Sequence, residues 1–479
     1  MNGFRTRIFE LHDLPGGLCT AWDRKEYIFD GCINYLVGSG ASQPFNQVWQ
    51  ELGALREIEI IHHAEFMRIV APDGKTLIVY VDPGRLEQEM VRQFPDDAWQ
   101  IKRCTRTIQQ FTRFDMARLQ QKPRSLMGPL DWMRLGWTML PFAPALLRYG
   151  FISTVDLAER MHDPFLRRAV PLMFAWPEIP VMAGQALLAY MHTGNAGFPA
   201  GASLEFAQAL ERRYLELGGE IHYKSQVEKI LVENDMAVGV RLYNDEVYKA
   251  NIVISAADGR GTIFDMLDGM YANRAIRQLY DGHHTVYPQI QVSLGVARDL
   301  SGEPHWVEYL LDKPLLIAGQ ERSHVGIKHY CFAPRLAPPG KSVIASLLPT
   351  TYSYWQHIYG HKLYDTEQEQ VADILIDFLG GIYPGIKSQI EVIDVATPLS
   401  HERYTGNWQG SNCGWLLTKG IMPLMLRGVR KTLPGLKNFY MAGQWVEPGG
   451  MVSVVAMSGR NAIQMICHAE GKPFMTSTV

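Results

Sequence analysis

The strongest constraint on the fold is a pattern near the C-terminal end of the chain. Residues 436–441 are apolar and β-prone, Gly443 follows them, and a short loop then contains Pro448-Gly449-Gly450. From there to Cys467, apolar residues recur at helical spacing. A strand, a glycine turn and a helix in this order direct backbone N–H groups and the positive end of a helix dipole towards an anion. We therefore expect an anionic ligand at residues 443–450.

A matching pattern lies at the opposite end of the chain. Residues 6–10 are β-prone and end in Glu10, and Pro15-Gly16-Gly17 follows. In a dinucleotide-binding fold, the acidic residue that closes the second strand hydrogen-bonds a ribose diol. A Gly-Gly pair lets the backbone approach such a ligand without an intervening Cβ. Alone, this segment is explained equally well by a plain surface turn; with residues 443–450 it predicts one dinucleotide held from both ends of the chain.

Further motifs between these two ends occur in a recognisable order. They are Phe198-Pro-Ala-Gly201 before a helix, Leu217-Gly-Gly-Glu-Ile221, Val227-Glu-Lys-Ile230, Ala237-Val-Gly-Val240, residues 441–450 and Ser458-Gly-Arg460. Over nearly the whole chain, this order resembles the phytoene desaturase and carotene isomerase-like family of FAD-dependent oxidoreductases, which has the glutathione-reductase-type dinucleotide fold.

The resemblance implies an α/β fold with two discontinuous domains. An FAD/NAD(P)-binding Rossmann-like domain is expected from residues 1–57, 198–284 and 431–479. A substrate domain that mixes helices with antiparallel sheet is expected from residues 58–197 and 285–430.

The resemblance also implies that FAD is the cofactor and that particular residues bind it. These residues are Glu10, Gly16, Gly17, Val227, Gly443, Glu447, Pro448, Gly449, Gly450 and Met451. Val227 would lie along the adenine through its backbone, although a valine in a strand is otherwise an ordinary core residue. Met451 stands where relatives commonly have a third glycine, so its side chain is expected to crowd the approach to the turn.

One departure from the family pattern is large. Family members open with a strand and G-x-G-x-x-G, which binds the pyrophosphate. Gly38-Ser-Gly40-Ala-Ser-Gln43 lacks the third glycine and the surrounding βαβ unit, so it does not replace that loop. We expect the first strand, the Gly-rich loop and the following helix to be absent, because the given sequence is a fragment or a truncated gene product. Loss of a central strand leaves backbone N–H and C=O groups unpaired, which is costly.

The residues that carry catalysis are not determined by the sequence. The resemblance places residues 397–410 over the flavin, which makes His401, Arg403, Tyr404 and Trp408 the candidates. His401 is a candidate proton shuttle because histidine titrates near neutral pH. The alternative is that His401 is a structural hydrogen-bond donor, as most single histidines are.

Composition narrows the class of protein. Of 479 residues, 47% are hydrophobic and 20% are charged, as in ordinary globular enzymes. The 46 Lys and Arg residues against 49 Asp and Glu residues give a net charge of −3, which argues against a general nucleic-acid binder. Six scattered cysteines without C-x-x-C spacing predict reduced thiols. His62-His63 and His283-His284 lack Cys or carboxylate partners at ligand spacing, so we expect no metal site.

The sequence allows two interpretations of whether the protein contacts a membrane. No apolar core follows Arg5 and Arg7, and residues 136–147 are too short for a transmembrane helix, so a cytoplasmic protein is expected. A basic amphipathic helix at residues 101–111, near an aromatic and leucine-rich segment, predicts a peripheral contact with an anionic membrane surface. Its basic residues are Lys102, Arg103, Arg106, Arg113, Arg118, Lys122 and Arg124, and the neighbouring apolar ones are Trp132, Trp137, Leu140, Phe142, Leu146 and Leu147. The alternative is a solvated helix packed over the substrate domain.

Local patterns predict many secondary-structure elements. Pro72-Asp73-Gly74 between two β-prone runs predicts a hairpin. Residues 83–191 are mostly helical in pattern, and Ser203 is expected to cap a helix that ends at Gly218. We predict strands at residues 220–223, 226–232, 238–243, 247–249, 251–258, 288–297 and 342–347, and helices from Gly259 onward and at residues 366–379.

The activity expected from the resemblance is FAD-dependent oxidation or reduction of C–C bonds in a lipophilic polyene. Hydride transfer between a substrate carbon and the flavin is the chemistry that such a cofactor supplies. Alternatives are a redox-neutral isomerase that uses reduced flavin, a cofactor-free remnant or partner subunit, and an amine oxidase on the same fold.

Overall fold

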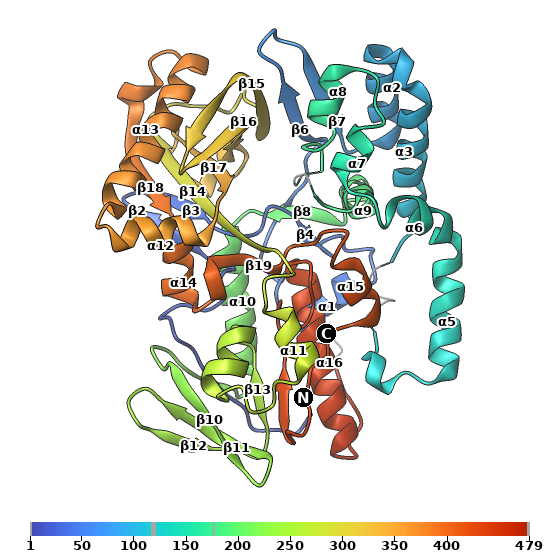
Figure 1. Ribbon diagram of the computed structural model, residues 1–479, viewed down its shortest axis with the longest axis vertical. Coiled ribbons are helices and arrows are strands. Elements are labelled where there is room, and N and C mark those ends of the chain that lie inside the picture. Colours follow the sequence, from blue (N-terminus) through green and yellow to red (C-terminus); the bar gives the residue numbers. More distant parts are fainter. Residues whose placement is uncertain (1, 116–120, 175, 177, 477–479) are drawn as a thin grey trace.

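The computed structural model describes residues 2–115, 121–174, 176 and 178–476 (Figure 1). A large sheet with helices α12 and α13 lies at the upper left of the view, and a group of helices from α2 to α9 lies at the upper right. Short parallel strands, a three-stranded meander and the long helices α10 and α16 lie below them. The two ends of the described chain meet, because the Asn2 side chain donates to the Met475 carbonyl oxygen (3.1 Å) and accepts from the Met475 N–H (2.7 Å).

The parallel strands form two separate pairs. Strand β1 (Arg7–Phe9) pairs with β9 (Glu220–His222), and β13 (Val253–Ser255) pairs with β20 (Phe439–Met441). Within the described residues, no ladder joins one pair to the other. The predicted α/β arrangement is therefore present, but its parallel sheet is divided. The flanking helices are α10 (Ala202–Glu216) and α16 (Val452–Ala469).

An antiparallel meander lies beside these pairs. It consists of β10 (Val227–Glu233), β11 (Met236–Leu242) and β12 (Val247–Lys249). A single parallel bridge between Met236 and Lys437 ties the meander to the chain just before β20. The predicted strands in this region are confirmed.

The largest sheet has eight strands and is almost entirely antiparallel. Its order is β18-β14-β17-β16-β15-β6-β7, with β19 also paired to β14, and only the β6–β15 pair is parallel. Its strands are β6 (Glu65–Val70), β7 (Thr76–Tyr80), β14 (Val286–Val296), β15 (Trp306–Ile317), β16 (Gln320–His329), β17 (Ser342–Pro349), β18 (Ile390–Ala396) and β19 (Ser411–Trp415).

Two helices cover the part of this sheet around β14. Helices α12 (Tyr352–Gly360) and α13 (Tyr364–Ile382) pack against it (Figure 1). Helix α13 buries Leu375 and Leu379, which are one turn apart and therefore lie on one face. They join Trp355 of α12 and alternate apolar residues of β14 in one core.

The predicted helical region of residues 83–191 is confirmed. Its helices are α2 (Pro83–Gln93), α3 (Ala98–Phe111), α5 (Pro129–Met139), α6 (Ala143–Tyr149), α7 (Thr154–Ala158), α8 (Pro164–Ala169) and α9 (Val181–His192). Helix α3 buries Ile101, Cys104, Ile108 and Phe111 in the core that it shares with β6 and β7. The apolar face of α3 therefore packs inside the protein, in agreement with the alternative of a helix packed over the substrate domain, and a contact of this region with a membrane stays a prediction. Arg118, part of the basic set in that prediction, lies outside the described residues.

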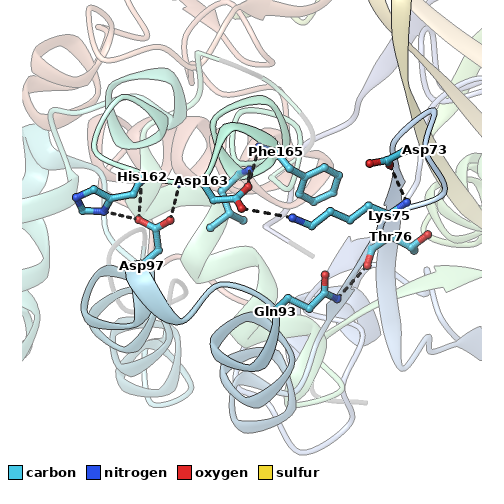
Figure 2. A network of polar contacts seen from close by, with 9 residues as sticks. Asp73, Lys75, Thr76, Gln93, Asp97, His162, Asp163 and Phe165 are labelled. Atoms are coloured by element: carbon cyan, nitrogen blue, oxygen red, sulfur yellow. Dashed lines mark hydrogen bonds and ion pairs between the residues drawn. The ribbon is translucent and has the colours of Figure 1, made fainter.

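A polar network holds the start of α3 against the neighbouring elements (Figure 2). The buried Asp97 carboxylate accepts hydrogen bonds from the backbone N–H groups of His162 (2.7 Å) and Asp163 (2.9 Å) and contacts His162 Nδ1 at 3.0 Å. Asp163 caps α8 and forms an ion pair with Lys75 of the β6–β7 turn at 3.4 Å. Gln93 at the end of α2 donates to the Thr76 carbonyl oxygen. The helices and the hairpin are thus fixed to one another.

Short elements connect these parts. They are β2 (Ala21–Arg24), β3 (Tyr27–Asp30), β4 (Leu36–Val37), α1 (Asn46–Glu51), β5 (Ile60–Ile61), β8 (Ala196–Pro199), α11 (Arg274–Leu279), α14 (Pro398–Thr405) and α15 (Met422–Arg427). Strand β3 shares a core with residues of β17, so residues 1–57 also contact the large sheet. The two-domain division given above stays a prediction.

Three local predictions differ from the structure. Strands β15 and β16 were not predicted, although they contribute two central strands of the large sheet. The helix expected from Gly259 is a single π-helical turn, Gly261–Met266. Ser203 lies inside α10, after the Gly201 cap; its Oγ accepts from the Ile33 N–H (2.7 Å) and its N–H donates to Asp30 (3.0 Å). The polar groups of Ser203 therefore bind residues 30 and 33, which are distant in sequence, and do not cap the helix.

Two kinds of feature are absent from the residues that the structure describes. None of the helices there combines the length and the apolar character that a membrane crossing requires. In that same part of the chain, no three His, Cys, Asp or Glu side chains gather as the ligands of a metal ion would.

Candidate functional site

Glu10 lies where the β1–β9 ladder ends. Its N–H donates to the His222 carbonyl oxygen (2.9 Å), and its carboxylate accepts from the His12 N–H (2.9 Å). Burial raises the pKa of the Glu10 carboxyl, against the lowering effect of the His12 N–H and ring. The Glu10 carbonyl oxygen accepts from the Ser225 N–H (2.8 Å), two residues before Val227, so the structure brings the start of β10 close to Glu10.

The two glycines after Pro15 have different surroundings. Gly16 has a φ of +104°, and a Cβ there would overlap the Cys19 carbonyl oxygen and lie 2.7 Å from Cβ of Ala207 in α10. Gly17 has a φ of +59° and no heavy atom within 4 Å of an added Cβ. Gly16 therefore lets the turn pack against α10, while Gly17 leaves the backbone open to a ligand.

The C-terminal turn shows the same division between packed and open glycines. Gly449 has a φ of +113°, and an added Cβ would meet only Cε of Met425, at 3.9 Å. Gly450 packs against Cys413 of β19 so closely that a Cβ would overlap that side chain. The Gly443 N–H donates to Oγ of Ser458 (2.7 Å) and is used inside the protein. Within the turn that was predicted to bind an anion, Gly449 is therefore the residue whose backbone stays open to a ligand.

The first turn of α16 has unsatisfied donors. Its N-cap, Met451, provides no side-chain hydrogen bond, and the hydroxyl of Ser453 is buried without a partner. Exposed N–H groups and the helix dipole at such an end favour a negative charge. The Met451 side chain packs against the core of the helical region. These features fit the negatively charged edge of a bound flavin.

Helix α14 and the turn after it connect the two distant patches. The Tyr404 ring meets the His12 ring edge-on at 5.5 Å, just after Glu10. Oδ1 of Asn407 accepts from Nε2 of Gln444 and Nε1 of Trp445, both at 3.2 Å, in the loop that follows Gly443. Residues 404–407 thus contact both ends of the predicted dinucleotide site. Arg403 is exposed and lies over the Tyr404 ring at 5.6 Å.

Two predicted residues have structural partners. Glu447 pairs with Lys431, which is buried. Trp408 packs with Tyr280, Trp415 and Trp445 in an aromatic cluster, and its backbone N–H donates to Oδ1 of Asp258 (2.9 Å). Pro448 begins the Gly449-Gly450 turn, and Val227 pairs with Leu242 in the meander. Their roles towards a cofactor remain predictions.

His401 of α14 is half-buried with its Nε2 atom shielded from solvent, which weakens the proposal that it shuttles protons. Burial lowers the pKa of His401 to about 4, and its Nε2 has no partner. A group whose pKa falls on folding stabilises the fold fully above its unfolded pKa of about 6.5 and loses that contribution as the pH falls towards 4. His401 is therefore neutral at pH 7.

We expect the His401→Leu variant to lose less stability on acidification than the unchanged protein. Between pH 7 and pH 5 the difference should be about 2 kcal/mol, because the unfolded chain alone then binds the proton. Urea denaturation at the two pH values measures it. His468→Leu, at an exposed histidine of α16, is the control and should leave the pH dependence unchanged. Equal pH dependence for His401→Leu and the unchanged protein would contradict this account.

Sequence reasoning missed an enclosed group of polar and aromatic side chains. A cavity of about 30 Å³, close to the volume of one water molecule, lies among these residues. Its lining consists of Asn34, Tyr35, His63, Phe66, Met191, Phe198, His305, Trp306, Lys328, Tyr330 and Phe332.

Lys328 is the central charge of this group. Its ammonium donates to Asn34 and lies 4.2 Å from the centre of the Trp306 ring, and burial lowers its pKa to about 8. Burial raises the pKa of Glu308 to about 7 and that of Asp30 to about 6, and both carboxylates support the charge of Lys328. Several titrating groups near neutral pH in one enclosed place are typical of functional sites. No signal in the sequence singled out Lys328, because β16 itself was not predicted.

His63, one of the adjacent histidines, belongs to the same group. Its ring stacks on His305 at 3.8 Å. Burial lowers the pKa of His63 to about 4 and that of His305 to about 2, so both rings are neutral at pH 7.

The chain is similar in sequence and in fold to several known proteins. A sequence model of the family described as flavin containing amine oxidoreductase matches residues 1–467. The chain is 24% identical over 492 residues to a chloroplastic prolycopene isomerase of Daucus carota, covering 96% of this chain and 75% of that protein. It is 24% identical over 497 residues to a lycopene-forming phytoene desaturase of a Paracoccus species, covering 97% and 93%. An oxidoreductase from Methanosarcina mazei has the same fold, with a TM-score of 0.57 at 16% identity over 96% and 94% of the two chains.

Proposed function

The chain belongs to the flavin containing amine oxidoreductase family, and from this premise we propose that it is an FAD-dependent oxidoreductase acting on C–C bonds of a lipophilic polyene. The family match agrees with the cofactor and enzyme class expected from the sequence. Relatives named for phytoene desaturation and for prolycopene isomerisation each match at least 95% of the chain, which supports a polyene as the substrate class. We further propose a cytoplasmic location, in keeping with six unpaired cysteines.

One observation carries the cofactor assignment. Residues 404–407 contact the segment after Glu10 and the loop after Gly443, which supports the proposal that the two patches bind one dinucleotide. Glu10 would bind the ribose, while Gly17 and Gly449 would admit the cofactor to open backbone. When bound, FAD supplies a centre that accepts or donates hydride. The first turn of α16 would stabilise negative charge on the ring system.

We expect the Glu10→Ala variant to bind FAD about tenfold more weakly, because a carboxylate that accepts from a ribose hydroxyl contributes roughly 1–2 kcal/mol. Equilibrium dialysis of FAD against the purified protein measures the affinity. Asp13→Ala removes a neighbouring exposed carboxylate and is the matched control. Unchanged affinity in Glu10→Ala would remove Glu10 from the site, and no FAD binding by the unchanged protein would favour the cofactor-free alternative.

The substrate assignment is tested by product analysis. The FAD-loaded protein is incubated with phytoene or with prolycopene, with and without a quinone as electron acceptor. A desaturase forms new double bonds only when the acceptor is consumed, and that result is expected. Turnover of amines with no change in either polyene would overturn the substrate class.

A redox-neutral isomerase is the second candidate. It is favoured by relatives named prolycopene isomerase that match at least 95% of this chain. Such an enzyme would convert prolycopene to another geometric isomer without consuming acceptor, after the flavin has been reduced. The same incubation therefore separates the two candidates.

A further inference from the structure

Two cysteines lie opposite each other at the open end of the β2–β3 hairpin. The pairing of the hairpin continues one step beyond its strands, because the Gly31 N–H donates to the Thr20 carbonyl oxygen (3.0 Å). The next pair in the same register is Cys19 with Cys32. Pairs with and without hydrogen bonds alternate in an antiparallel ladder, so Cys19 and Cys32 occupy a position without them, where facing side chains are closest.

The two thiol groups are in contact. They form a hydrogen bond with each other, and all six cysteines of the chain are free thiols. Facing Cα atoms at such a position are about 4.5 Å apart, and a disulfide joins Cα atoms about 4.4–6.8 Å apart. The backbone at Cys19 and Cys32 therefore suits a disulfide. Other cysteines have different neighbours: Cys104 contacts the Gln185 amide, for example.

The start of α10 holds both cysteines in place. The Cys19 thiol donates to the Ser203 carbonyl oxygen (3.7 Å), and the N–H of Ile33, the residue after Cys32, donates to Oγ of the same serine (2.7 Å). Both cysteines also pack against one apolar core, to which α1, α10 and α16 contribute. Tertiary contacts therefore keep the two sulfurs facing each other.

The closed end of the hairpin is fixed independently. The Asp394 carboxylate of β18 accepts from Nε1 of Trp22 (3.0 Å) and from Nε of Arg24 (2.7 Å), and Figure 1 shows β2 and β3 beside β18. Because this end is held, a sulfur–sulfur bond at the open end acts on the turn before β2 and does not move the hairpin as a whole.

The surroundings of the pair favour reaction at one of its thiols. Cys19 and Cys32 are partly exposed, whereas Cys104, Cys413 and Cys467 are buried, so a small oxidant can reach the pair. The hydrogen bond with Cys32, together with partial burial, raises the pKa of the Cys19 thiol well above its usual range. The thiolate is the nucleophile in disulfide chemistry, so we expect Cys32 to react first.

Oxidation by a low-molecular-weight disulfide takes two steps. The Cys32 thiolate attacks one sulfur of the oxidant, whose sulfur–sulfur bond breaks and releases a small thiolate. The Cys19 sulfur then loses its proton and attacks Cys32 of the mixed disulfide, which releases the second small thiolate. The protein loses two hydrogen atoms, and the two protons end on the two small thiols.

We propose that Cys19 and Cys32 form a reversible disulfide that restrains the turn at Gly16 and Gly17. In the reduced protein the Cys19 N–H donates to the Gly16 carbonyl oxygen (2.9 Å), so Cys19 closes the turn in which the Gly17 backbone is open. The disulfide ties the end of this turn to the chain after β3. The redox state of the surrounding thiols thereby sets the freedom of this turn. The proposal does not depend on the cofactor or the substrate proposed above.

The test is treatment of the purified, reduced protein with glutathione disulfide, followed by mass spectrometry. We expect a mass about 2 Da lower, from the two lost hydrogen atoms, and four cysteines that can be alkylated in denaturant instead of six. Trypsin cleaves after Arg24 and Lys25, between the two cysteines, so the bond joins the separate peptides 8–24 and 26–56. Dithiothreitol should restore six reactive thiols.

Variants and stability provide the controls. Cys19→Ser should take up one glutathione at Cys32 and form no joined peptides, while Cys331→Ser, at another partly exposed cysteine, should form them as the unchanged protein does. In urea, oxidation of the unchanged protein should favour the folded state about a hundredfold, because the bond closes a loop of about 14 residues in the unfolded chain. Oxidation should leave the unfolding of Cys19→Ser unchanged.

Three results would overturn the proposal. They are six reactive thiols after treatment, glutathione retained at Cys32 of the unchanged protein without an internal bond, and an oxidised protein that is less stable than the reduced one. The peptide measurement uses the unchanged protein, so it decides the question even where a variant does not fold.

Discussion

Replacing Gly450 by alanine is expected to lower the free energy of unfolding by about 3 kcal/mol. Two costs add at this position. The φ of +64° lies in the left-handed region, which costs an L-residue about 1–2 kcal/mol. The new Cβ also overlaps Cys413 and lies 2.9 Å from its Cα, and overpacking of this kind costs roughly 1–3 kcal/mol. Urea denaturation of the cofactor-free protein measures the change.

Gly471→Ala is the matched control for the backbone cost alone. Gly471 has nearly the same φ, +66°, but no heavy atom lies within 4 Å of an added Cβ. It should cost only about 1 kcal/mol. Combining Gly450→Ala with Cys413→Gly removes the overlapping side chain and should recover part of the loss, because the two residues are in contact. Equal losses for Gly450→Ala and Gly471→Ala would show that β19 yields to the added methyl group.

Replacing Glu308 by glutamine is expected to stabilise the protein by roughly 3 kcal/mol at pH 8. Burial raises the pKa of the Glu308 carboxyl to about 7, and its Oε2 is buried without a hydrogen-bond partner. Ionisation of this group therefore costs stability at alkaline pH. Glutamine keeps an acceptor for Nε1 of Trp306, which donates to Glu308 at 2.9 Å.

The stabilisation by Glu308→Gln should depend on pH. A carboxyl whose pKa is raised on folding favours the folded state while it is protonated, and that contribution is lost as the pH rises from about 4.5 through 7. The advantage of Glu308→Gln should be small at pH 4.5, should grow to pH 7 and should then be constant. Glu321→Gln, at an exposed position of the neighbouring strand β16, should show no such trend. An advantage that is independent of pH would mean that Glu308 is not the titrating group.

Local patterns in the sequence predicted much of the fold. The β6–β7 hairpin, the meander and the β20–α16 unit each depend on neighbours in the chain, such as the turn at Asp73-Gly74. Strands β15 and β16 were missed because Lys313 and Pro314 interrupt the apolar alternation of β15, where the pairing also has an irregular register. Their turn, at Ala318-Gly319, places a non-glycine residue at a positive φ of 49° and carries a weak sequence signal.

The candidate site was predictable where a motif carries its own geometry. The turn at Gly449 and Gly450 was predicted because a glycine turn before a helix is a local pattern, and its role towards a cofactor stays a prediction. The pairing of Lys431 with Glu447 and the use of the Gly443 N–H by Ser458 depend on tertiary contacts. The contact between Lys328 and Asn34 joins residues 294 positions apart, so no spacing rule reveals it.

The aromatic cluster beside the Gly443 loop gives this protein a built-in optical reporter. Trp408, Trp415 and Trp445 lie with their ring centres 4.8–6.3 Å apart, and Trp415 and Trp445 are almost fully shielded from solvent. Indole emission from such an environment is blue-shifted and inaccessible to iodide. If the contact between Asn407 and Gln444 broke and the loop opened, iodide would reach these rings. In a variant that keeps these three tryptophans and replaces the other eight by phenylalanine, fluorescence can therefore follow the ordering of this loop in solution, before any substrate is known.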